Sequence, residues 1–337
     1  MNSYYRVLAI FEHKIPDRIP TFELVIHPLI ISKLNGRSDL LDFVEKMKLD
    51  GVTIFQNIEL KEISNNILID EWGIKRINSI EKNKIAIEGP IKKRSDLKNI
   101  IIPNLNVSGK FNDLSVAVKR FKKRKFIVFK INDVISIPRD LLGYENFLIN
   151  LYDDQKLILE LVDLSYYYNL ELASKVRQIG ADAVVLGDDF ADNRGLLFSP
   201  SLYKKLFYPH FCKLIKSLKE LGLFVIKHSD GNINEILDLL IQSNIDCLNP
   251  IDPLAGMDIA KLKIQYGKKI VLMGNVNCAT TLVNGNKNEI IKEVLNIIKN
   301  ASNGGGLIMS SSNSIHSGVD PYNYLLMIKT IRKYGRY

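Results

Sequence analysis

A histidine and a carboxylate stand two positions apart in the motif His228-Ser229-Asp230-Gly231, which directly follows the apolar run FVIK. Successive side chains of an extended segment alternate, so His228 and Asp230 should point to the same side. An imidazole beside a carboxylate can act as a general acid with an orienting partner, or can bind a divalent metal. The spacing therefore makes His228 and Asp230 candidate catalytic residues and candidate metal ligands.

Other polar residues stand within or just after β-rich runs. Two acidic residues, Glu23 and Asp188, are further catalytic candidates. Candidates for substrate binding are Asn57, Lys130, Asp189, Asn249, Asn275, Asn313 and His316. Asp and Asn also favour turns and helix caps, so a purely structural role stays open for such residues at strand ends.

Eight β-rich runs, each followed by a longer segment, would have to position these residues: 19–25, 51–56, 126–132, 183–189, 223–228, 245–249, 270–275 and 307–313. Several are apolar nearly throughout, which is typical of parallel strands buried on both faces. The repeat predicts a single α/β domain over 1–337, a (β/α)8 TIM barrel whose site lies at the carboxyl ends of the strands. A doubly wound open sheet is the alternative, but no glycine-rich phosphate fingerprint follows the first run.

Residues 57–125 interrupt this rhythm between the second and third runs. The stretches 70–74 and 84–90 indicate a short hairpin. We interpret 57–125 as an insertion within the barrel domain that forms a lid over its mouth.

The net charge of +9 does not indicate nucleic-acid binding, because the basic residues are dispersed among acidic ones. The densest basic run, 119–125, is typical of a solvated helix end. Cys212, Cys247 and Cys278 are far apart, which excludes a disulfide framework or zinc ribbon. Neither a signal peptide nor an apolar stretch of about 18 residues is visible. We therefore expect a cytoplasmic protein that binds neither membranes nor nucleic acid.

Several motifs resemble the uroporphyrinogen decarboxylase / cobalamin-dependent methyltransferase superfamily. They keep their order along nearly the whole chain and read RVL, PDRIP, DEWG, EGP, GDDFADNRGLLFSP, HSDGN, NPIDPLAGMD, GNVNC and GGGLIMSSSNSIHSG. The resemblance implies a TIM barrel and one of two chemistries.

The decarboxylase branch uses an arginine-rich loop after the first strand, an Asp in a Phe-Ser-Asp-Ile motif and a His at the eighth strand. Here the first run, PTFELVIHP, has no arginine, Asn57 stands in place of the Asp, and Asn313 in place of the His. A neutral amide does not supply the charge of a carboxylate. The resemblance thus argues against true porphyrinogen decarboxylation.

The methyltransferase branch holds zinc with a His-x-Cys after the fifth strand and a Cys at the eighth. His228 matches that His, whereas Asp230 and Asn313 replace the two cysteines. The resemblance therefore implies zinc or another divalent metal in an oxygen-rich site built on His228 and Asp230, with Glu23, Asp188 or Asp189 as further donors.

Three functions follow from these patterns. The leading one is a methyltransferase-like enzyme that moves a methyl group between a small substrate and a thiol or a corrinoid on a partner protein. The second is a decarboxylase-type lyase in which His228 is the general acid and Asp230 orients it. The third is a non-catalytic ligand-binding barrel. The sequence leaves open whether two copies form a homodimer.

Overall fold

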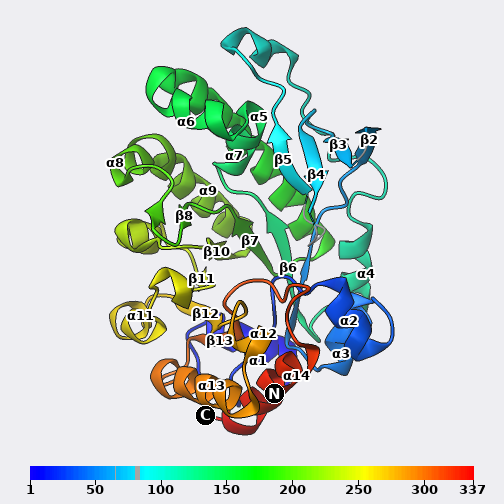
Figure 1. Cartoon of the computed structure of the whole chain (residues 1–337), viewed down its shortest axis with the longest axis vertical. Coiled ribbons are helices and arrows are strands. Elements are labelled where there is room, and N and C mark those ends of the chain that lie inside the picture. Colours follow the sequence, from blue (N-terminus) through cyan, green and yellow to red (C-terminus); the bar gives the residue numbers. More distant parts are fainter. Residues whose placement is uncertain (65, 80–83) are drawn as a thin grey trace.

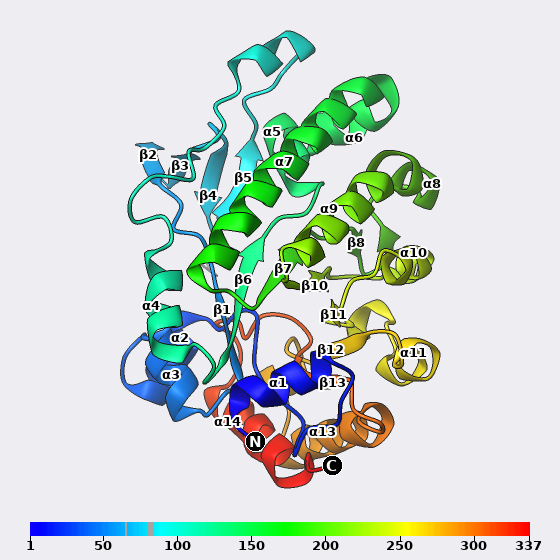
Figure 2. The ribbon, with the colours of Figure 1, turned by 180° about the vertical axis from the view of Figure 1, so that it is seen from behind.

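The computed structural model describes residues 1–64, 66–79 and 84–337. Its centre is a curled, parallel seven-stranded sheet with helices on the outside (Figures 1 and 2). In spatial order the strands are β1 (Gly51–Ile54), β6 (Phe126–Ile131), β7 (Ala183–Gly187), β10 (Phe224–His228), β11 (Cys247–Asn249), β12 (Val271–Val276) and β13 (Leu307–Ser311). They coincide with seven of the eight predicted runs, and the TIM-barrel-like class is confirmed.

The prediction of a regular first strand over 19–25 is wrong. This segment lies between β13 and β1, but it makes only isolated bridges, Thr21 with Met309 and Ile26 with Ile315. One reason is Pro20, which has no N–H to donate. A second is that the backbone N–H of Ser311 donates to the Glu23 carboxylate, 3.0 Å away, rather than to a backbone carbonyl. The segment 19–25 therefore closes the barrel as an irregular seam, with only a few backbone hydrogen bonds to β13 and β1.

Helices follow most strands and cover the outer face (Figure 2). They are α1 (Ser3–Phe11), α2 (Pro28–Asn35), α3 (Leu40–Lys46), α4 (Asn112–Phe121), α5 (Ser136–Leu142), α6 (Tyr144–Asp153), α7 (Gln155–Ile179), α8 (Pro200–Leu202), α9 (Tyr208–Glu220), α10 (Leu237–Gln242), α11 (Ile259–Tyr266), α12 (Thr281–Asn284), α13 (Lys287–Ala301) and α14 (Pro321–Tyr334). Side chains cap several of them, as Asp154 does for α7 through the Leu157 N–H, 3.0 Å away. No helix in the described ranges has both the length and the apolarity needed to cross a bilayer.

The insertion after β1 is larger than the predicted hairpin. It contains a four-stranded antiparallel sheet of β2 (Leu60–Ser64), β3 (Ile67–Asp70), β4 (Lys75–Asn78) and β5 (Lys84–Glu88). The sheet packs beside α5, where Arg76 Nη2 lies 3.2 Å from Asp140 Oδ2 and the Ile91 N–H donates to the Leu141 carbonyl over 3.0 Å. Residue 65 and residues 80–83 of the predicted insertion lie outside the described residues. Its role as a lid stays a prediction.

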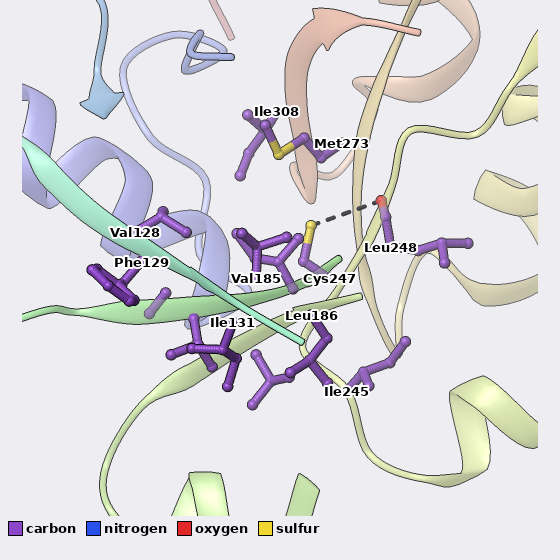
Figure 3. Close-up of a cluster of buried hydrophobic side chains, with 14 of the residues drawn as sticks. Val128, Phe129, Ile131, Val185, Leu186, Ile245, Cys247, Leu248, Met273 and Ile308 are labelled. Atoms are coloured by element: carbon purple, nitrogen blue, oxygen red, sulfur yellow. Dashed lines mark hydrogen bonds between the residues drawn. The ribbon is translucent and has the colours of Figure 1, made fainter. Parts of the chain in front are cut away.

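The barrel interior is filled by apolar side chains from successive strands (Figure 3). Val128, Val185, Cys247, Met273 and Ile308 are all buried there. At the amino-terminal base, the ring of Phe11 from α1 stacks on Phe126 at a centroid distance of 5.2 Å. Because the interior toward the amino-terminal base is filled by apolar side chains, the candidate polar side chains lie at the carboxyl ends of the strands.

Candidate metal centre and active site

Asp189, His228 and Asp230 form a cluster where β7 and β10 end. Each offers one ligand atom, and these atoms lie within 4.8 Å of one another. His228 Nε2 is 3.7 Å from Asp189 Oδ1 and 3.5 Å from Asp230 Oδ1. The backbone N–H of Asp230 donates to Asp189 Oδ1 over 3.0 Å, which joins the two loops. The strand-end pattern predicted Asp189 as a substrate-binding residue, and the structure places it beside the two predicted metal ligands.

Asn249, at the end of β11, fixes the orientation of the His228 ring. His228 Nδ1 lies 2.7 Å from Asn249 Oδ1. The Asn249 amide is itself oriented, since its Nδ2 donates to the Met273 carbonyl over 3.2 Å. An amide oxygen can only accept, so Nδ1 carries a hydrogen and Nε2 faces the two carboxylates. A cation between Nε2 and the carboxylates, either a proton or a metal, would balance their negative charge.

Asp230 has one oxygen paired and one unpaired. Asn313 Nδ2 donates to Oδ2 over 2.5 Å, whereas the buried Oδ1 accepts no hydrogen bond from any described residue. Burial, together with the charge of Asp189, raises the pKa of Asp230 to about 6, against the lowering effects of His228 and Asn313. A buried carboxylate oxygen without a donor is costly unless a cation occupies the space beside it. One imidazole nitrogen and two carboxylate oxygens fit a divalent metal with a coordination position left for substrate.

An inner cavity of about 130 Å³ opens beside this cluster. Its walls include Glu23, Lys130, His228, Asn249 and Asn313, all predicted site residues. These come from five separate strand ends or loops, so the fold brings together residues far apart in the sequence. The inner cavity therefore joins candidate acid–base groups to the candidate metal ligands.

Glu23 is a buried acid in the wall of the inner cavity, with 5% of its surface exposed. It accepts hydrogen bonds from the Ser311 N–H at 3.0 Å and the Ser311 hydroxyl at 2.7 Å. Burial raises the pKa of Glu23 to about 8, although both Ser311 bonds lower it. At neutral pH the side chain is therefore mainly a neutral carboxylic acid that can donate a proton.

Lys130, on β6, places a cation at the inner cavity. Its stem crosses Gly187, where a Cβ atom would come within 2.7 Å of Lys130 Cε. Its ammonium donates to Asn132, and burial lowers its pKa even though Asp188 and other acids raise it. Glycine at 187 thus leaves room for the stem of the lysine on its way to the cavity.

A second, outer cavity of about 280 Å³ shares Val25, Asn313 and Ser314 with the inner one. Its other lining residues are His27, Asp252, Leu254, Cys278, Ala279, Ser312, Ile315 and His316. Burial raises the pKa of the Cys278 thiol to about 11, so the cysteine is protonated and favours a packing role at neutral pH.

Three predicted site residues lie outside the cluster and outside the walls of both cavities. Asp188 is fully buried and accepts the backbone N–H groups of Ile135 and Ser136 at the start of α5. Asn275 donates to the Ile251 carbonyl over 2.9 Å. Asn57 is exposed and lines a separate groove that also includes Leu40 and Asp113.

The sequence patterns also missed a buried lysine. Lys227 is a fully buried residue of β10. Its Nζ donates to Asp133 Oδ2 over 2.7 Å and to the Asp188 carbonyl over 2.6 Å. The same Nζ lies 3.6 Å from the centroid of the Phe190 ring. Burial and neighbouring Asp188 raise the pKa of Asp133 well above its usual range. Burial also opposes ionisation of Asp188, yet a hydrogen bond shared with Asp133 and the charges of Lys227 and Lys130 lower its pKa. A lysine inside an otherwise apolar strand was the available signal for this network.

Comparison with known proteins places the chain among others of this architecture. The family model described as uroporphyrinogen decarboxylase (URO-D) matches residues 41–334. The structure of a methyltransferase from Methanosarcina mazei is similar, with 17% identity, 99% of each chain covered and a TM-score of 0.80. A B12-independent methionine synthase from Shewanella sp. W3-18-1 is less similar, with 13% identity, 80% of this chain and 74% of that chain covered, and a TM-score of 0.48. No curated protein matches the sequence.

Proposed function

The chain belongs to the uroporphyrinogen decarboxylase family, and from this premise we propose that it is a metal-dependent, methyltransferase-like member. It would move a methyl group between a small substrate and either a thiol or a corrinoid carried by a partner protein. The observation that carries the proposal is the cluster of Asp189, His228 and Asp230, with Nε2 of His228 facing two carboxylates.

These three residues would hold the metal. When bound, zinc or a similar divalent ion acts as a Lewis acid that lowers the pKa of a thiol or hydroxyl beside it. Asn249 keeps His228 in the tautomer that leaves Nε2 free. Asn313 holds one oxygen of Asp230, so that the unpaired oxygen remains available as a donor atom.

The inner cavity supplies the acid–base groups. Glu23, a neutral acid at pH 7, can donate a proton to the oxygen or nitrogen from which a methyl group departs. Lys130 can hold one anionic group of the substrate. In this role Glu23 and Lys130 bind and protonate the substrate, while Asp189, His228 and Asp230 bind the metal.

Two further observations support methyl transfer over porphyrinogen decarboxylation. In the described part of the chain, neither cavity has an arginine in its wall, whereas the decarboxylase branch holds substrate carboxylates with an arginine-rich loop. The similar structure from Methanosarcina mazei is named a methyltransferase.

A lyase is the second candidate, favoured by the same distances of 3.5 and 3.7 Å around His228 Nε2. If a proton rather than a metal lies between Nε2 and the carboxylates, His228 is an imidazolium that can act as a general acid. The two candidates differ in whether the cluster binds metal.

Elemental analysis of the purified, untagged protein separates them. We expect about one divalent metal per chain in the wild type and a large loss in His228→Ala and Asp189→Asn. The metal-loaded protein is then incubated with methylcobalamin and a small thiol. Methyl transfer would break the cobalt–carbon bond, place the methyl group on sulfur, release the thiol proton to solvent and leave the electron pair on cobalt, which is visible in the corrinoid spectrum. A metal-free protein with no turnover would leave the lyase and the ligand-binding barrel.

A further inference from the structure

We propose that the outer cavity is a specificity subsite that binds an uncharged hydrogen-bond acceptor, such as an amide or ketone oxygen, at the Nε2–H of His27. The proposal rests on the proposed function in one respect: it names the chemical class of the group that a substrate presents beside the metal centre. The binding event itself can be measured without turnover.

The tautomer of His27 is fixed by the helix that follows it. The backbone N–H of Leu29 donates to His27 Nδ1 over 3.2 Å, so that this side chain caps α2. Nδ1 is therefore the acceptor nitrogen of a neutral ring, and Nε2 carries the hydrogen. His27 lines the outer cavity with 4% of its surface exposed, and its Nε2, which is closed to solvent in this structure, contacts no acceptor among the described residues. A ligand oxygen would therefore reach Nε2 after a small shift of the cavity wall. A buried donor without an acceptor costs folding free energy, which a ligand oxygen would recover.

The other histidine of the outer cavity differs in this respect. His316 Nε2 lies 3.0 Å from the Cys278 carbonyl, and its Nδ1 accepts the Gly318 N–H over 3.1 Å. Both nitrogens of His316 are thus used to join two loops. Of the two imidazoles in this wall, His27 alone has a spare donor in the part of the chain that is described.

The charge of the wall favours a neutral acceptor over an anion. Asp252 lines the cavity, and no lysine or arginine does so among the described residues. Asp252 is held as an acceptor by the Leu254 N–H, 2.9 Å from its Oδ1. Much of the remaining wall is apolar, including Val25, Leu254 and Ile315. A carboxylate or phosphate would face Asp252 without a compensating cation, whereas an amide or ketone would not.

The position of the cavity links it to the metal cluster. Asn313 lies in the walls of both cavities and donates to Asp230. The volume of about 280 Å³ is roughly nine times the share of one water in the liquid, about 30 Å³. A small organic group therefore fits in the cavity by volume, and one that bonds to His27 would extend past the shared residue Asn313 in the direction of His228.

The test uses butyramide and butyrate, which have nearly the same shape but differ in charge. Binding is followed on protein with ¹⁵N-labelled histidine through the His27 Nε2–H signal. We expect butyramide to shift this signal and butyrate to bind at least about tenfold more weakly. In His27→Asn, butyramide should bind about three- to tenfold more weakly, a fold-change typical of one lost hydrogen bond. Asparagine is a good N-cap, so this variant keeps the cap of α2.

Equal affinity of wild type and His27→Asn for butyramide would overturn the proposal, and so would an unshifted His27 signal or equal binding of butyrate. The matched control is Asp189→Asn, which lies in the metal cluster and outside the walls of the outer cavity. It should lose metal yet bind butyramide like the wild type. If butyramide binds as expected but no methyl transfer is found, the proposed function fails alone. If methyl transfer is found and His27→Asn binds butyramide normally, only this inference fails.

Discussion

Asp188 and Asp189 are adjacent in the sequence, but their carboxylates lie in different environments. Asp188 is fully buried and accepts the Ser136 N–H over 2.7 Å, whereas Asp189 Oδ1 lies 3.7 Å from His228 Nε2 at the mouth of the barrel. Successive side chains of an extended segment point to opposite sides, which explains the division. One carboxylate holds a helix on the barrel, and the other belongs to the candidate metal centre.

Substitution at these two positions should therefore have opposite effects. Asp188→Asn places an amide NH₂ against backbone donors and should lower the free energy of unfolding by about 2–4 kcal/mol, while metal affinity per folded molecule is kept. Asp189→Asn should change stability by less than about 1 kcal/mol and weaken metal binding strongly. Urea denaturation and metal titration measure the two quantities. Loss of metal binding in a folded Asp188→Asn protein would contradict this division.

The buried Lys227 should be essential for stability. Lys227→Met removes the cation from Asp133 and Asp188 and should cost about 3–5 kcal/mol, because buried carboxylates lose their partner. The double variant Asp133→Asn with Lys227→Met removes one of those carboxylates and should recover part of the loss. Thermal and urea unfolding of both variants give the comparison, and identical stabilities of the single and double variants would refute the proposed pairing.

Asn249 should control metal affinity without binding metal itself. Asn249→Ser removes the acceptor that fixes the His228 tautomer, and loss of such an outer partner typically weakens metal binding by about 10–100-fold. The control is Asn275→Ser, which removes a buried amide that donates to the Ile251 carbonyl away from His228. Competition with a chelator of known affinity measures both. We expect the control to bind metal within about twofold of the wild type, and an equal loss in both variants would count against the role of Asn249.

The buried acid Glu23 should make stability depend on pH. Its pKa rises from 4.5 to about 8 on folding, so the folded state binds the proton more tightly than the unfolded chain. The resulting stabilisation is full below pH 4.5 and is lost as pH rises through 8. From pH 4 to pH 9, the difference in unfolding free energy between Glu23→Gln and wild type should shift by about 4–5 kcal/mol in favour of the variant, at about 1.4 kcal/mol per pKa unit. Urea unfolding at several pH values checks this, and parallel stability–pH curves would show that Glu23 ionises normally.

The fold was largely predictable because seven strands are short apolar runs that alternate with helical segments, a pattern typical of parallel strands buried on both faces. The prediction of the first strand failed because the N–H of Ser311 on the neighbouring strand donates to the side chain of Glu23 rather than to a backbone carbonyl, and because Pro20 has no N–H. The number of strands in the insertion was underestimated because each has only four or five residues. These strands show little of the apolar–polar alternation by which a half-buried strand is recognised in a sequence.

The site was predictable only in part. His228 and Asp230 follow from local spacing, because both lie on one strand end. The roles of Asp189 and Asn249 depend on β7 and β11 lying on either side of β10, which local spacing does not reveal. The orientation of Asn313 toward Asp230 requires the barrel to close across its mouth. Such contacts depend on the tertiary arrangement of distant segments.

The irregular seam over 19–27 has a consequence for how the barrel opens. Amide hydrogens in the seven paired strands are protected by ladder bonds, whereas the segment between β13 and β1 shares only scattered backbone bonds with its neighbours. Local openings occur where few such bonds must break, so hydrogen exchange should be fastest along this side of the wall. Glu23 and His27 both lie on that side. We therefore expect the barrel to open first at the seam, beside the two cavities, while the rest of the sheet stays paired.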